Sequence, residues 1–378
     1  MQPILEGRNR ALLHDVAVMR RALHNAQIPD ELTPYRDRLV ALCDASHARI
    51  QRNLLYLGLG QPQILEDVLS ETQGAMQAVR LLSSLLAIPV LRADASDRLC
   101  LRLIHWLHTE HPETKQFPAA FSDGNCAISP FVSFNPIYYF PCIEQRGLLF
   151  LSLFFHEFGH LLYACHRPEM DDLVGELQRR IYAVLMPVSQ RNDPHAEEQS
   201  ARRQVIVNTW YSWIQELFCD AVGFVMAGPC YLHAFSAFVS TMDPTDFSHD
   251  PQRSSHPVTM LRIRFLAERA AAAGSGDLAE RIEGEWETIA QTIGVVEDYQ
   301  GVYDDALGDP IRRTIEDMLT ETSPRRYLAS EVAGGEWSAD TDSFVRLINA
   351  AWYVYMGDPD RYDAWEMAQI RALLESPQ

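Results

Sequence analysis

Apolar residues recur at every third or fourth position over most of the first 110 residues, a pattern that predicts amphipathic helices. One apolar stripe covers residues 5–23, and two more cover residues 39–57 and 68–86. Prolines separate the three stripes and mark the breaks between helices. We therefore expect three or four packed helices here, and no candidate catalytic residues lie in them.

The pattern changes between residues 111 and 142, where several prolines interrupt it. Residues 127–134 alternate between apolar and polar side chains, which is typical of a β-strand. Pro130 has no N–H to donate to a neighbouring strand, so an edge strand is favoured over a central one.

The helical pattern returns at residue 146 and continues through most of the remaining chain. Residues 148–165 are apolar on nearly all sides, which predicts a buried helix. Further helices are expected over residues 171–186, from an N-cap at Asn192 to a stop at Gly228-Pro229, and over residues 257–273. The fold class predicted from these patterns is mainly α, with a small edge β-strand region.

Composition indicates which classes of partner the protein can bind and in which cellular compartment it is expected. The 378 residues carry 32 basic and 51 acidic side chains, a net charge of −19, which argues against nucleic acid as a partner. Seven cysteines without a CxxC pair suit free thiols in a reducing compartment. The first 21 residues lack the apolar core of a secretion signal, and the longest apolar run, residues 147–155, is too short for a membrane span. We expect a cytoplasmic protein with no membrane span.

The predicted buried helix contains the sequence His156-Glu157-Phe158-Gly159-His160, an HExxH motif. Residues four apart lie on the same face of a helix, so both imidazoles can reach one metal ion. Two neutral ring nitrogens suit zinc, and the adjacent carboxylate suits a general base. The alternative is a pair of core histidines bonded to their neighbours. Gly159 is costly inside a helix, by about 1 kcal/mol, so we expect another element to approach closely there.

A third metal ligand is expected from another helix, because catalytic zinc sites have three protein ligands and an open position. Glu216 is the best candidate, since it lies in a second apolar stretch, residues 210–226. Asp220 lies one turn further on the same face, where it can accept the outer N–H of a ligand histidine. The alternative is a carboxylate pair on a solvated face, which the apolar neighbours disfavour.

HExxH followed downstream by ExxxD resembles the gluzincin metallopeptidases, and the resemblance covers roughly residues 131–266. The segment Ser255-His256-Pro257, followed by Arg262, is similar to the His-Pro…Arg segment of the CAAX-prenyl-protease and heat-shock membrane protease group. Unlike those proteases, this chain is expected to have no spanning helices, and the spacing from its motif to Glu216 is longer.

The resemblance implies a zincin-like catalytic core in which two helices hold Zn²⁺ between them. Residues 1–110 and 274–378 would then be helical flanking regions, and residues 111–273 the core. The implied roles fall on the matching positions, with zinc ligands His156, His160 and Glu216, the catalytic base Glu157, and Asp220 as the partner of a ligand histidine.

Other residues near the motif have weaker claims. His256 is a candidate donor to the transition state, or an ordinary residue at a helix start. Arg262 is either a structural salt-bridge former or an anion contact. Tyr211 and Tyr231 flank the Glu216 helix, and a tyrosine can stabilise an oxyanion. Tyr211, however, points about 140° away from Glu216 on an ideal helix, so we assign it to the core.

The resemblance, together with this chemistry, implies a zinc-dependent metallopeptidase acting on peptide or protein substrates, which the edge strand would hold by strand addition. Two other functions stay open. One is a non-catalytic, zinc-stabilised scaffold whose helical flanks bind a protein partner. The other is a zinc hydrolase of a non-peptide amide.

Overall fold

The computed structural model describes residues 1–115, 118–129, 136–186, 196–250, 256–334, 337–338 and 343–375. The protein is mainly helical with one small sheet, as the hydrophobic pattern predicts. It folds as two compact units, of which unit 1 comprises Met1–Trp106 and Lys115–Pro141, and unit 2 comprises Leu107–Thr114 and Cys142–Gln378. The sheet segment therefore belongs with the N-terminal helices. The functional boundaries at residues 110 and 273 stay a prediction.

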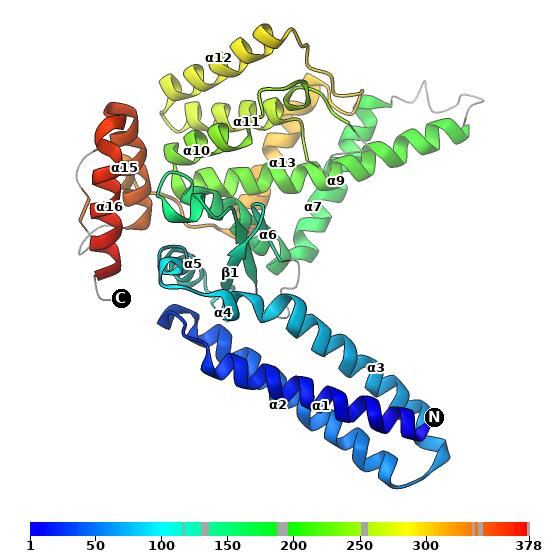
Figure 1. Ribbon diagram of the computed structural model, residues 1–378. Helices are drawn as coiled ribbons and strands as arrows, with labels where there is room; N and C mark the ends of the chain where they lie inside the picture. Colours follow the sequence, from blue (N-terminus) through cyan, green and yellow to red (C-terminus); the bar gives the residue numbers. More distant parts are fainter. Residues whose placement is uncertain are drawn as a thin grey trace. The chain divides into compact units, whose positions relative to one another are not determined.

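Unit 1 is built on three long helices, and α1 packs along both α2 and α3 (Figure 1). The stripe predicted over residues 5–23 is the buried face of α1. The π-helical turn Leu82–Leu86 follows α3 directly. The helices are α1 (Gln2–Asn25), α2 (Thr33–Gly58), α3 (Leu65–Leu81), α4 (Ile88–Arg92) and the first part of α5 (Arg98–Glu110).

The sheet of unit 1 has three described strands in the order β1-β3-β2. β1 (Ala120–Asp123) runs parallel to β3 (Ile137–Phe140), and β2 (Ala127–Ile128) pairs antiparallel with the other side of β3. β2 thus begins the predicted strand and lies at an edge. The rest of that prediction, from Pro130 onward, lies outside the described residues.

One segment of unit 1, Pro62–Arg92, is long and apolar enough to cross a membrane, with a mean hydropathy of 1.5 in its most apolar window. Within that window, 39% is buried in the protein. Core helices of soluble proteins pass the same test of length and composition, so this finding decides nothing about location. The cytoplasmic location therefore stays a prediction.

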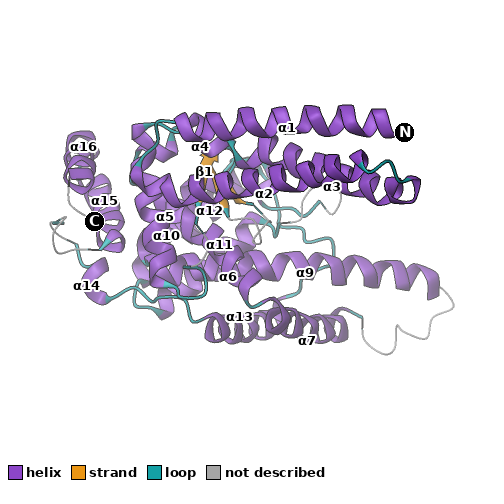
Figure 2. Ribbon diagram, turned by 90° about the horizontal axis from the view of Figure 1, so that it is seen from below, coloured by secondary structure: helices purple, strands orange, loops and turns teal. Residues whose placement is uncertain are grey.

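Unit 2 packs the helix α6 against α9, and α7 and α13 pack beside α9 (Figure 2). α11 and α12 form an adjacent antiparallel pair. The helices of unit 2 are α6 (Phe154–Cys165), α7 (Arg167–Leu185), α9 (Ala196–Ala227), α10 (Pro229–Val239), α11 (Thr259–Ala272), α12 (Gly276–Ile293), α13 (Gly308–Thr322), α14 (Ala329–Val332), α15 (Phe344–Gly357) and α16 (Pro359–Glu375).

Three boundaries in unit 2 differ from expectation or fall outside the described residues. The helix predicted over residues 171–186 begins four residues earlier, at Arg167. The buried helix begins at Phe154 rather than at residue 148, after a 3₁₀ turn over Leu151–Leu153. The backbone N–H of Leu148 donates to Glu366 of α16 at 2.6 Å, which fixes the entering chain outside the helix. The N-cap expected at Asn192 lies among residues that the structure does not describe.

Candidate metal centre

The candidate metal centre lies where α6 contacts α9, and Gly159 permits this close contact. A Cβ atom at Gly159 would lie 2.9 Å from the Cα of Cys219 and 3.1 Å from its Sγ. Real Cβ atoms do not approach backbone so closely, so only glycine allows this helix spacing. The approach expected at Gly159 is therefore present, and it brings the HExxH face of α6 onto the Glu216 face of α9.

Three predicted ligands converge at this contact. The Nε2 atom of His156 lies 3.4 Å from Oε2 of Glu216, and Nε2 of His160 lies 3.6 Å from Oε1 of Glu216. Two donor atoms that share a tetrahedral zinc ion at bond lengths near 2.1 Å are separated by about 3.4 Å. The two contacts end on different oxygens of Glu216, and their lengths are those expected between ligands of one cation. The side chains are 10%, 26% and 12% exposed, so His160 forms the open side of the group.

Asp220 holds His156 from behind. Its Oδ1 atom lies 2.9 Å from Nδ1 of His156, the ring nitrogen opposite the one that faces Glu216. A carboxylate at this position favours a proton on Nδ1, so in the neutral imidazole the Nε2 lone pair would face a cation. This is the contact expected from the i, i+4 spacing of Glu216 and Asp220.

Arg262 of α11 forms a buried salt bridge with both carboxylates of α9. Its Nε and Nη2 atoms donate to the two oxygens of Asp220 at 2.7 and 2.8 Å, and Nη2 lies 3.3 Å from Glu216. The guanidinium also lies over the ring of Phe235, 4.7 Å from its centroid. Of the two roles open for Arg262, the structure favours the salt bridge, because only 8% of the residue is exposed.

Glu157 is buried beside this network and takes no part in it. Only 4% of its surface is exposed, and its carboxylate makes no hydrogen bond or salt bridge with any residue of the described chain. A buried carboxylate is normally paired, because an unpaired charge is costly in a low-dielectric interior. Glu157 therefore has the lone pairs free to accept a proton.

His256 also reaches the site, from the segment that precedes α11. Its Nε2 atom lies 3.6 Å from Oε1 of Glu216, and 58% of its side chain is exposed. Ser255, which precedes it in the motif, lies outside the described residues. His256 thus stands on the solvent side of the group, where a substrate would approach. Tyr211 is directed elsewhere, since its hydroxyl donates to Asp171 of α7 at 3.2 Å.

The carboxylates shift the pKa values of their neighbours. Burial alone would lower the pKa of His156, but its hydrogen bonds with Asp220 and Glu216 outweigh burial and raise the pKa to about 10. Burial would raise the pKa of Glu216, yet the His156 hydrogen bond and the Arg262 charge hold it below its usual range. Metal binding to an imidazole requires its neutral form. A cation that binds Nε2 of His156 would therefore displace the proton that Nε2 carries in the charged form.

The cluster carries more negative than positive charge. Arg262 pairs with two of the three buried carboxylates, Glu216 and Asp220, and Glu157 has no such partner among the described residues. In the described part of the chain no other arginine or lysine pairs with them. Like charges in a buried site repel unless a cation stands between them. When a cation replaces the extra proton of His156, two negative charges remain, and a divalent cation would balance them.

Cys219 provides a second choice of ligand on α9. Ligand atoms of His156, His160 and Cys219 all lie within 4.8 Å of one another. Burial raises the pKa of the Cys219 thiol well above its ordinary value, and nearby carboxylates add to the effect. The Sγ atom is also packed against Gly159. All seven cysteines are free, as their number and spacing predicted.

The sequence did not predict the contact that Tyr231 makes with Asp220. Its hydroxyl donates to Oδ1 of Asp220 at 3.0 Å, and the residue is fully buried. A Cβ atom at Gly223 would lie 2.4 Å from the Tyr231 ring, so this glycine provides the room for it. Gly223, one turn beyond Asp220, could have indicated that a bulky side chain packs there. Which side chain it is depends on how α10 folds back on α9. Tyr231 faces Asp220, so it is not an oxyanion donor.

Comparisons with protein-family models, with curated proteins and with solved structures find no match to this chain. The function proposed below therefore follows from the residues of the site.

Proposed function

We propose that this protein is a zinc-dependent metallopeptidase whose catalytic centre is the contact between α6 and α9. The observation that carries the proposal is the convergence of His156 and His160 on the Glu216 carboxylate, with the unpaired Glu157 beside them. His156, His160 and Glu216 would hold the ion. When bound, Zn²⁺ would polarise a substrate carbonyl and lower the pKa of water.

The residues around the ion would have separate tasks. Glu157 accepts a proton from the attacking water and then delivers it to the leaving amine. His256, on the solvent side of Glu216, donates a hydrogen bond to the oxygen of the scissile carbonyl. Asp220 keeps His156 in the tautomer that leaves Nε2 free, and Arg262 and Tyr231 hold Asp220 in place.

Peptide or protein substrates are proposed because the site combines a divalent-ion donor set with a general base, as in the gluzincin peptidases that the motif resembles. The predicted cytoplasmic location and the predicted partner surface on the helical flanks belong to the same proposal. Strand addition at β2 is not part of it, because most of that segment lies outside the described residues.

The proposal is tested by Glu157→Gln, an isosteric change that removes the base and leaves all three ligands. Metal content is measured by elemental analysis, and hydrolysis is measured on denatured protein and peptide libraries. We expect unchanged zinc and a loss of activity of about 10²–10⁴-fold, the usual contribution of a general base. Glu176→Gln, at an exposed position of α7, is the matched control and keeps full activity.

The outcomes separate the proposal from its rivals. A scaffold would show zinc in both proteins and no hydrolysis in either. A hydrolase of a non-peptide amide would fail on the peptide libraries and cleave small amides in a Glu157-dependent way. Peptide hydrolysis that survives Glu157→Gln would refute the assigned base.

A further inference from the structure

The charge of the protein is divided unequally between its two units. Unit 1 carries 13 basic and 12 acidic side chains, a net charge of +1. Unit 2 carries 19 basic and 39 acidic side chains, a net charge of −20. The negative charge of the chain therefore belongs to the unit that holds the candidate metal centre.

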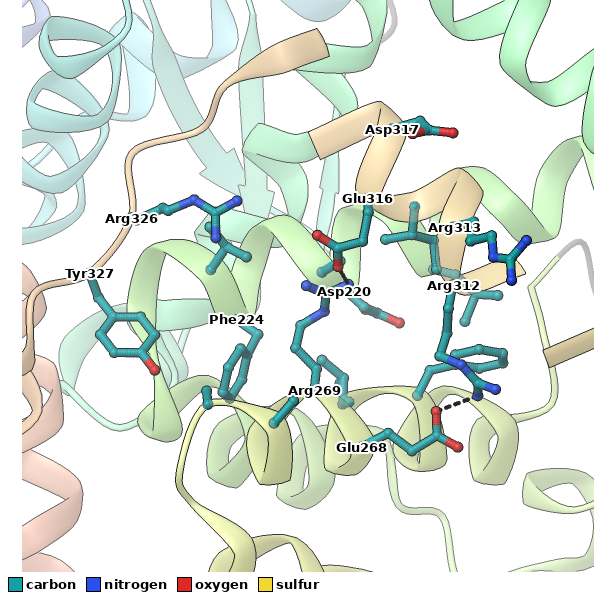
Figure 3. Close-up of a pocket in the computed structure, with 18 of the residues that line it drawn as sticks. Asp220, Phe224, Glu268, Arg269, Arg312, Arg313, Glu316, Asp317, Arg326 and Tyr327 are labelled. Atoms are coloured by element: carbon teal, nitrogen blue, oxygen red, sulfur yellow. Dashed lines mark hydrogen bonds and ion pairs between the residues drawn. The ribbon is translucent and has the colours of Figure 1, made fainter. Parts of the chain in front are cut away.

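Arginines of unit 2 gather at one pocket that the three proposed metal ligands do not line. The pocket has a volume of about 890 Å³ and lies between α9, α11 and α13 (Figure 3). Five arginines of the described residues line it, namely Arg180, Arg269, Arg312, Arg313 and Arg326. Arg269 pairs there with Glu316, and Arg312 with Glu268, each at 2.7 Å (Figure 3). Positive charge in unit 2 is thus partly collected, and partly neutralised, at this pocket.

The segments that build the metal centre contain no lysine or arginine. They are residues 147–166, which include α6, and residues 204–252, which run from within α9 through α10 toward His256. Their carboxylates are Glu157, Glu216, Asp220, Asp243, Asp246 and Asp250. Arg262 of α11 adds a guanidinium, which Glu216 and Asp220 already share. These segments therefore carry a surplus of negative charge.

Bound zinc would not reverse the sign of this surplus. With Zn²⁺ present and both imidazoles neutral, the ion and Arg262 carry three positive charges, and the three buried carboxylates of the centre carry three negative charges. The field on the open side then comes from the surrounding chain. The segment that leads to His256 carries the exposed Asp243, and hydrogen bonds from Thr245 lower the pKa of this carboxyl, so it is charged at neutral pH.

We infer that the substrates of this centre are cationic, namely peptide or protein segments rich in lysine and arginine. The inference rests on the proposed peptidase function and names its substrate class. A field of one sign steers partners of the opposite charge and raises their association rates by about 10–10³-fold. Acidic segments meet the same field as a repulsion, so the two classes of substrate are separated at the encounter.

The test compares three peptide libraries that share a randomised centre and carry four lysines, four glutamines or four glutamates in their flanks. Hydrolysis by the zinc-loaded, full-length protein is measured at about 10 mM and about 1 M salt, where the Debye length is about 30 and 3 Å. At low salt we expect kcat/KM for the lysine library to exceed that for the glutamate library by about 10–10³-fold, with the glutamine library between them. At high salt the ratio should fall below about threefold, because the field is screened.

A pair of double variants tests where the field arises. Asp243→Asn with Asp250→Asn removes two charges from the segment that leads to His256. This change should reduce the preference for lysine about two- to fourfold, because one charge at roughly 10 Å in water changes an encounter about twofold. Asp15→Asn with Glu66→Gln removes two exposed charges from unit 1 and should leave the preference unchanged.

A binding measurement judges the inference without hydrolysis. Fluorescence anisotropy follows labelled lysine and glutamate peptides with zinc-loaded Glu157→Gln protein, and we expect the lysine peptide to bind more tightly at low salt. That result without hydrolysis of any library would refute the peptidase and support a cationic partner. Equal hydrolysis of the three libraries, a preference that high salt does not reduce, or equal binding of the two peptides would overturn the inference.

Discussion

Glu31 in unit 1 and Glu216 in unit 2 are both buried carboxylates, with 2% and 12% of their side chains exposed. Two arginines of α5, Arg98 and Arg102, lie 3.2 and 3.1 Å from Oε1 of Glu31. Glu216 instead shares the single Arg262 with Asp220, and the unpaired Glu157 is nearby. The protein therefore meets the Glu31 carboxylate with two guanidinium groups, whereas in the described part of the chain Glu216 and Asp220 share one.

The difference separates a structural ion pair from a candidate metal centre. A carboxylate that faces two guanidinium groups has no need of an added cation, because positive charge already offsets its own. A cluster with surplus negative charge and two imidazoles offers donors to a divalent ion. Burial alone therefore does not mark a functional acid, whereas burial with unmatched charge does.

The largest expected effect is at Glu31. Glu31→Ala removes a buried carboxylate that pairs with Arg98 and Arg102, and it should lower the free energy of unfolding by about 3–5 kcal/mol. Asp44→Ala breaks the exposed pair with Arg20 and should cost less than about 1 kcal/mol. Chemical denaturation measures both. Equal losses in the two variants would mean that Glu31 is not a buried structural partner.

The next largest effect is expected at the contact between α6 and α9, where the candidate metal centre lies. Gly159→Ala places a methyl group against the Cys219 backbone and should destabilise the protein by about 1–3 kcal/mol while weakening zinc binding. Gly175→Ala in α7, where nothing lies within 4 Å of the added Cβ, should instead stabilise it by roughly 0.5–1 kcal/mol. If both variants gain stability, the close contact of α6 and α9 is wrong.

A smaller change tests the support of Asp220. Tyr231→Phe removes one hydroxyl and its hydrogen bond, which should cost about 1 kcal/mol of stability. Zinc affinity should fall about tenfold, because partners of a ligand histidine orient it. Competition with a chromophoric chelator reads the affinity. An unchanged affinity with lowered stability would make Tyr231 a core residue only.

The dependence of stability on pH below neutrality tests the charge of Glu31. The pKa of Glu31 lies below its ordinary value: burial opposes this shift, but a backbone hydrogen bond and Arg102 outweigh it. A carboxyl with a lowered pKa contributes stability above its unfolded pKa, near 4.5, and loses it as the pH falls further. Glu31→Gln should therefore flatten the loss of stability below pH 4.5, as followed by thermal unfolding. A curve that keeps the wild-type slope would contradict this.

Much of the candidate site could be predicted from the spacing of its residues in the sequence, because helix geometry determines which residues share a face. The i, i+4 positions of His156 with His160, and of Glu216 with Asp220, became two facing pairs once α6 met α9. The glycine at 159 signalled that contact in advance. These features are local, so the sequence alone suffices to predict them.

The remaining features depend on contacts between distant segments. Tyr231 bonds Asp220 only because the chain reverses at Gly228, which has a φ of 75°, and begins α10. β1 and β3 were not predicted, because each has four residues in a proline-interrupted region and gains its pairing from the other. The chain that leads into α6 is held at Leu148 by Glu366, more than two hundred residues away.

The most direct test of the central claim is the zinc content of the purified wild type beside Glu216→Ala and Cys219→Ser. The account predicts stoichiometric zinc in the wild type and in Cys219→Ser, and its loss in Glu216→Ala. Stoichiometric zinc in Glu216→Ala, or none in the wild type after expression with added zinc, would contradict it.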